Sequence, residues 1–120
     1  MTEHIADIAV YQDGLALADL QLAGISSINV KISHELGILN VHPDVHRYVR
    51  EARVMGIGVS TFHWLTGRAP GADQAAFAYS QMQQLPGGTT GLAHVVDVES
   101  TVHPPTEKHW RDYCLTMARQ

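Results

Sequence analysis

The feature that most constrains the fold is a pattern that occurs four times along the chain. Each time, a short run rich in branched apolar residues leads through a polar loop into a segment of helical period. The expected strands are residues 4–10, 25–32, 57–64 and 92–98. The expected helices are residues 15–23, 43–54 and 72–84, with a last one from Pro104-Pro105 onward. Such successive βα units predict an α/β fold with a parallel sheet and right-handed crossovers.

Periodicity alone does not choose between an open doubly wound sheet and a barrel, because both obey that rule. A nucleotide site is disfavoured, since no glycine cluster follows the first strand. The last helix carries four residues at the i, i+3, i+4, i+7 spacing of one buried stripe, namely Trp110, Tyr113, Cys114 and Met117. Cys114 is the single cysteine, so an internal disulfide is excluded and a buried thiol is expected.

The composition indicates a single domain over residues 1–120. With 120 residues, 45% of them hydrophobic and 17% charged, the chain resembles ordinary globular domains. A formal net charge of -4 argues against nucleic acid and anionic membranes as partners, since both attract clustered basic surfaces. The sequence shows neither a signal-peptide pattern nor an apolar stretch of about 20 residues, so synthesis as a cytoplasmic product is expected.

Two acids close the fourth expected strand. Because side chains alternate along a strand, Asp97 and Glu99 share one face, about 6.6 Å apart along the backbone. Crowding like charges raises the pKa of at least one carboxyl group, so a protonated acid and an ionised partner coexist near neutral pH. Glycoside hydrolysis uses that division of labour. The alternative is two solvated acids at a strand end, where Glu99 helps to cap the next segment.

Other strand ends supply further candidates. Asp7 lies late in the first strand and could reach the same rim, or it forms a turn or a salt bridge. Lys31, at the end of the second strand, could pair with the acids, or it is an ordinary exposed lysine. Phe62, His63 and Trp64 end the third strand and suit stacking against sugar rings, with core packing as the competing account.

A metal site is not expected. The chain has eight histidines, and His42 and His46 are spaced as two ligands on one helical face would be. No glutamate lies between them in the arrangement of zinc proteases, so ordinary surface histidines are the preferred interpretation.

Five short segments occur in an order that is typical of one enzyme family. They are Asp7-Ile8-Ala9-Val10-Tyr11-Gln12, Ile28-Asn29-Val30-Lys31-Ile32-Ser33, Phe62-His63-Trp64, Gln74-Ala75-Ala76-Phe77 and Asp97-Val98-Glu99. Together they resemble the lysozymes of glycoside hydrolase family 25. The resemblance extends over nearly the whole chain and implies four βα units that form the first half of a TIM-like barrel.

The resemblance also implies roles for particular residues. Glu99 would be the general acid, Asp97 would orient the N-acetyl group or stabilise the oxocarbenium-like centre, and Asp7 would complete the acidic cleft. The implied substrate is peptidoglycan, cut between N-acetylmuramic acid and N-acetylglucosamine without a metal or cofactor. The residues expected to bind substrate are Lys31, Phe62, His63, Trp64 and Gln12.

The chain departs from the family pattern in places. His34 stands where the family usually has a glutamate, with Glu35 one residue later, and His42 stands where it has an aspartate before the helix. Ser60 and Phe62 replace a usual glycine and tyrosine. These departures put the substrate contacts on that side of the cleft in question.

The largest departure is length, because the family domain has about eight strands and four are expected here. A half-barrel leaves two strand edges unpaired, so we expect a homo-oligomer, or a partner chain that completes or covers it. The preferred function is a muramidase, of phage endolysin or cell-wall lytic type, acting at the bacterial wall or within a virion. The alternative is a catalytically silent half-barrel that binds glycan or serves a structural role in a larger assembly.

Overall fold

The computed structural model describes residues 4–9 and 16–120, and every structural statement below concerns these residues. All four predicted βα units are present. In chain order the elements are β1 (Ile5–Ile8), α1 (Leu17–Leu22), β2 (Ser27–His34), α2 (Val45–Met55), β3 (Gly58–Trp64), α3 (Gly71–Gln83), β4 (Ala93–Asp97) and α4 (Glu107–Ala118).

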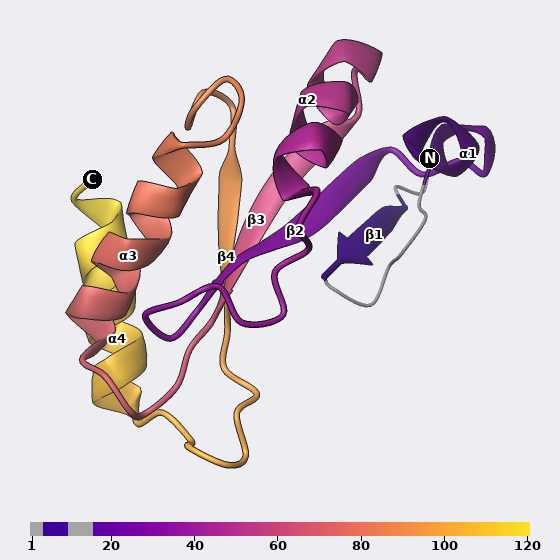
Figure 1. The fold of residues 1–120 in the computed structure, drawn as a ribbon. Helices are drawn as coiled ribbons and strands as arrows, with labels where there is room; N and C mark the ends of the chain where they lie inside the picture. The colour runs from indigo at the N-terminus through magenta and orange to yellow at the C-terminus, as the bar shows by residue number, and fades with distance from the viewer. Residues whose placement is uncertain (1–3, 10–15) are drawn as a thin grey trace.

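The four strands form one parallel sheet in the order β1-β2-β3-β4 (Figure 1). Each strand lies beside the one that precedes it in the sequence, so the strand order never reverses. A doubly wound sheet reverses its order at a switch point, whereas a barrel adds strands in sequence. The observed order therefore resolves the ambiguity left by periodicity: the fold is four βα units like the first half of a barrel.

The core lies between the sheet and its helices. β2 contributes three apolar side chains on one face, and α2 and α3 pack over β2 and β3. The buried apolar residues of these three elements are Ile28, Val30, Ile32, Val45, Tyr48, Val49, Ala52, Ala75, Ala78 and Met82. Helix α4 lies along α3 at the β4 side of the sheet (Figure 1). None of the helices in the described part has the length and apolar character to span a bilayer.

The predicted buried stripe on α4 is largely wrong. Only Tyr113 is buried, whereas Trp110 keeps 48% of its surface exposed, and Cys114 and Met117 are half-buried. The side of α4 that carries Trp110 meets Val98 and Pro105 in a shallow hollow. Helical period identifies a face with apolar residues but does not supply the partner that buries it.

Two helices begin a few residues later in the structure than the sequence predicts. Helix α2 begins at Val45 with Asp44 as its N-cap residue, rather than at Pro43. Helix α4 begins at Glu107, because Thr106 forms a capping box with His109 in which each side chain bonds the other residue's backbone N–H.

Candidate active site

The face of the sheet opposite the core helices gathers the polar side chains of the strands. In the register, Asp7 pairs with Asn29, Asn29 with Ser60, and Trp64 with Asp97. Residues that pair directly across a sheet share a face, and so do residues two apart on a strand. This surface, hereafter the open face, carries Asp7, Asn29, Lys31, Ser60, Phe62, Trp64, Val95 and Asp97.

A cleft of about 380 Å³ lies on the open face. It brings together the three acids predicted from the sequence, which come from β1, from the end of β4 and from the segment that follows. Its lining residues are Asp7, Asn29, Phe62, Val95, Val96, Asp97, Val98 and Glu99. Carboxyl groups at the C-terminal ends of parallel strands are where catalytic groups of barrel enzymes gather.

The carboxyl groups of Asp97 and Glu99 are electrostatically coupled. Partial burial raises the pKa of Asp97 to about 6, assisted by the charge of Glu99 and a hydrogen bond between the two side chains. The charge of Lys31 opposes this rise in pKa. The Asp97 carboxyl group therefore keeps its proton to a higher pH than an ordinary aspartate does, beside a second carboxyl group, and acid-assisted glycoside cleavage uses such a pair.

The raised pKa of Asp97 predicts a pH-dependent effect of Asp97→Asn on stability. The folded state binds the Asp97 proton more tightly than the unfolded chain, so this residue lowers stability as pH rises between about 4 and 6. Asparagine removes that penalty. We expect the variant to be more stable than the parent at about pH 7.5 and nearly equal below about pH 4, measured by urea unfolding. A stability difference that is the same at both pH values contradicts the raised pKa.

Asp7 is held by a short relay that sequence reasoning did not identify. The Asn29 side-chain amide donates to the Asp7 carboxylate at 3.2 Å, and the Ser60 hydroxyl donates to the Asn29 carbonyl oxygen at 2.8 Å. The relay runs across three strands and aims the exposed Asp7 carboxylate along the open face. Because Asn29 alternates with the apolar residues Ile28 and Val30, the sequence already places it on the same face as Lys31. That alternation could have identified Asn29 as a site residue.

Lys31 differs from its expected setting at a strand end. It lies in the interior of β2 and is only 4% exposed. Its ammonium group donates to Nδ1 of His34 at 2.8 Å and lies 5.3 Å from the centroid of the Trp64 ring. The expected pairing with the acids is indirect, because no carboxylate within residues 4–9 and 16–120 forms a salt bridge with Lys31.

His63 faces the helices and not the cleft, so the prediction that it contacts substrate is wrong. Its side chain is fully buried, with Nδ1 2.7 Å from the Ser33 hydroxyl and Nε2 2.9 Å from the Gln74 carbonyl oxygen. The amide oxygen only accepts, so Nε2 carries the proton and Nδ1 accepts from Ser33. Burial lowers the pKa of His63 to about 4, and a neutral ring is therefore part of the core.

A second histidine behind the sheet, His94, is half-buried and joins β4 to α4. Nδ1 of His94 lies 2.7 Å from the Thr61 hydroxyl, and Nε2 lies 2.5 Å from the Tyr113 hydroxyl. Burial lowers the pKa of His94 to about 4 and raises the pKa of Tyr113, so both groups are neutral at physiological pH. This pair explains why Tyr113 alone of the expected α4 stripe is buried.

The remaining predicted positions are distributed as follows. Phe62 and Trp64 lie on the open face, as a sugar-stacking role requires, whereas Gln12 is outside the described residues. His42 is buried rather than on the surface, and its Nδ1 accepts from the backbone N–H of Asp44 at 3.0 Å. No cluster of three metal-binding side chains occurs in the part of the chain that the structure describes.

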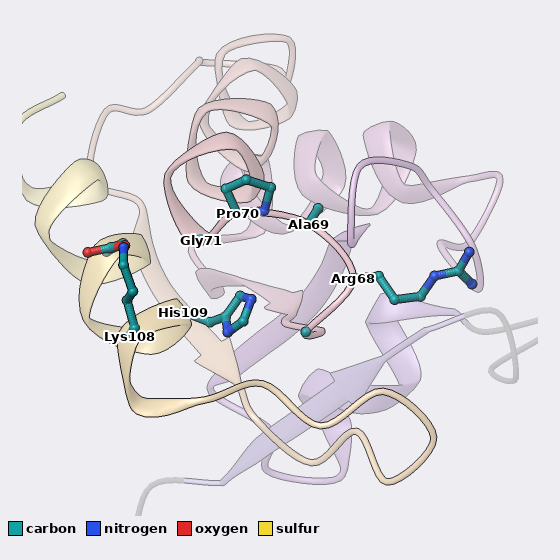
Figure 2. A pocket seen from close by; sticks show the side chains of 8 residues that line it. Arg68, Ala69, Pro70, Gly71, Lys108 and His109 are labelled. Carbon is teal, nitrogen blue, oxygen red and sulfur yellow. The ribbon is translucent and has the colours of Figure 1, made fainter.

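A hollow of about 350 Å³ outside the open face lies between the loop before α3 and the start of α4 (Figure 2). Arg68 and Lys108 at its rim point away from one another (Figure 2). Each is engaged by an acid, Arg68 by Glu35 at 3.7 Å and Lys108 by Asp112. The loop is tightly packed, since a Cβ atom on Gly71 would lie 2.0 Å from the carbonyl oxygen of His109. Both cations at this hollow are therefore already paired with acids.

Comparison with solved structures shows the same fold in three enzymes. The muramidase from Acremonium alcalophilum is 17% identical, with a TM-score of 0.79 over 98% of this chain and 61% of that chain. The lysozyme from Streptomyces coelicolor is 15% identical, with a TM-score of 0.76 over 99% of this chain and 59% of that chain. A family 25 glycosyl hydrolase from Bacillus anthracis is 19% identical, with a TM-score of 0.75 over 98% of this chain and 54% of that chain. No match was found among curated protein sequences.

The chain thus spans 54–61% of the lengths of these three solved structures. The model of one family, glycosyl hydrolases family 25, matches residues 6–120, which include the open face and all three acids of the cleft. The chain belongs to glycosyl hydrolases family 25.

Proposed function

We propose that this chain forms the acid-bearing part of a peptidoglycan-cleaving lysozyme, which hydrolyses the link between N-acetylmuramic acid and N-acetylglucosamine. The observation that carries the proposal is the coupled pair Asp97 and Glu99, which shares one cleft with Asp7. Family membership and the muramidase and lysozyme that share the fold support the same chemistry.

In the proposed reaction, Glu99 donates a proton to the leaving glycosidic oxygen. Asp97 orients the N-acetyl group or stabilises positive charge at the anomeric carbon, and Asp7 contributes a third carboxyl group to the cleft. Phe62 and Trp64 supply apolar surface on the same face for a sugar ring. Water then attacks the anomeric carbon and returns a proton to the Glu99 carboxylate, so the broken glycosidic C–O bond is replaced by a C–OH bond.

The test is incubation of the chain with purified peptidoglycan, followed by reduction of the new sugar ends and their identification by mass spectrometry. New reducing ends on muramic acid support the proposal, and new reducing ends on glucosamine contradict the assigned bond. Glycan binding without cleavage by a folded sample would replace this function with a binding or structural module. Clearing of intact bacterial cells supports the finer proposal of an endolysin-type or lytic role at the cell wall.

We also propose that another polypeptide, a second copy or a different chain, covers the open edges of the sheet. Within residues 4–9 and 16–120, the outer edges of β1 and β4 pair with no strand, and Val95 and Val98 are about half exposed. Unpaired strand edges are templates for association. We expect light scattering to give a mass above that of one chain. A monodisperse, folded monomer contradicts this proposal.

A further inference from the structure

An irregularity in β2 turns His34 toward the open face. Residues 31 and 34 would normally point to opposite faces of a strand. The register shifts between Lys31 and Ser33, so that Ser33 pairs with His63 and His34 pairs with Trp64. A bulge of this kind re-aims a side chain, and here it brings Lys31, His34 and Trp64 together on one surface. These three residues are called the Lys31 cluster below.

Lys31 gives this cluster a positive charge that no salt bridge within the described residues neutralises. Lys31 is only 4% exposed, and its ammonium group contacts a ring nitrogen and an aromatic face. The charge of Asp97 also acts on Lys31, but the two residues form no salt bridge. A buried cation ordinarily has a carboxylate partner, because its desolvation is otherwise costly. Asp97 opposes the Lys31 charge only from beyond salt-bridge distance, so the Lys31 cluster retains room for an anion in direct contact.

The contact with Lys31 fixes the proton of His34. An ammonium group only donates, so Nδ1 of His34 accepts and Nε2 carries the hydrogen. Burial and the charge of Lys31 lower the pKa of His34, against the effect of Glu35, so the ring is neutral. No hydrogen bond from Nε2 to another part of residues 4–9 and 16–120 is present, which leaves a polarised donor available.

Packing holds the His34 ring in place. It stacks on Trp64 with centroids 5.8 Å apart and planes 5° from parallel. The next residue, Glu35, adopts a left-handed φ of 56° and donates its backbone N–H to the carbonyl oxygen of Trp64 at 3.1 Å. Its carboxylate accepts from Thr66 and pairs with Arg68, so it is already engaged on the far side.

We propose that the Lys31 cluster is a specificity-determining subsite for a carboxylate-bearing substituent of the glycan. His34 donates Nε2–H to the carboxylate, Lys31 polarises the ring from behind, and Trp64 stacks on the sugar. This proposal rests on the proposed function, since Trp64 is in register with Asp97 and the subsite adjoins the cleft. The ligand class is muramic acid whose lactyl carboxylate is free, in preference to the same sugar with that group blocked as an amide.

The test measures binding, so it is independent of cleavage. Trp110→Phe leaves Trp64 as the only tryptophan, and Trp64 fluorescence then reports titration with a muramic-acid disaccharide in its free-acid or carboxamide form. A charge-assisted hydrogen bond predicts about ten- to a hundredfold tighter binding of the free acid. His34→Glu should remove or invert this preference through charge repulsion, and His34→Gln should weaken it.

His46→Glu is the matched control, because it adds the same charge at an exposed histidine of α2 and should leave the preference intact. Circular dichroism confirms that each variant is folded. Equal affinity for the two saccharides, binding of neither, or an unchanged preference in His34→Glu overturns the proposal. A retained preference without cleavage would instead count against the proposed enzymatic function while leaving this subsite standing.

Discussion

We expect Glu99→Gln to lower the rate constant of the proposed glycan cleavage by about 100- to 10,000-fold, the usual contribution of a positioned general acid. Glutamine keeps the shape of the side chain but cannot transfer a proton to the leaving oxygen. Glu99 is exposed, and it lies just beyond the end of β4, so the change should leave folding intact. Reducing-end release from purified peptidoglycan measures the rate, and circular dichroism confirms the fold.

The matched control for this loss is Glu107→Gln. Glu107 is an exposed glutamate in the first turn of α4 and is not among the residues that line the cleft. It should retain the parent rate within about twofold, since surface changes remote from a site are usually neutral. Cleavage by Glu99→Gln at the parent rate would show that a different group supplies the proton. A loss in both variants would point to damage outside the active site.

Gln74→Leu should lower the free energy of unfolding by about 3 kcal/mol or more, because it leaves several buried polar groups without partners. The Gln74 amide accepts from the backbone N–H of Thr66 and donates to the carbonyl oxygens of Thr66 and Ala69 at 2.8 Å each. It also accepts from His63. Leucine fills a similar volume but makes none of these bonds. Urea unfolding followed by circular dichroism measures the change.

Gln83→Leu provides the comparison on the same helix. Gln83 is exposed near the end of α3, so the substitution should change stability by less than about 0.5 kcal/mol. Similar unfolding midpoints for both variants would show that the network around Gln74 contributes little. The hydrogen bonds of Gln74 also hold the segment after Trp64 against α3, because its side-chain amide donates to the backbone carbonyl oxygens of both Thr66 and Ala69.

The sequence was sufficient to predict the order of elements and the acidic cleft. Strand and helix periods are local properties, and Asp97 and Glu99 follow directly from alternation at the end of a strand. Asp7 was a candidate from its place late in the first strand and from the family resemblance, and the structure places it in the same cleft. Exact helix starts depended on cap geometry, as Thr106 and His109 show at α4.

What could not be predicted depends on contacts between distant parts of the chain. The bulge in β2 leaves no local pattern, so His34 was identified only as a departure from the family and Lys31 as a strand-end lysine. The sequence around His63 fits both a position in the core and a position in the cleft. Only its hydrogen-bond partners, Ser33 and Gln74, decide between the two. The exposure of Trp110 likewise depends on what packs beside α4.

The sequential strand order has a consequence for how the three carboxyl groups are held. Within the described chain, β1 has four residues and pairs only with β2, so its detachment breaks one ladder and leaves the β2–β4 ladders intact. Proteins whose units contact only their neighbours open from the ends inward. Asp97 and Glu99 lie at the β4 end of the sheet, whereas Asp7 lies on β1, the strand whose detachment costs the least free energy. We therefore expect the position of Asp7 in the cleft to be lost at a lower free energy than global unfolding requires.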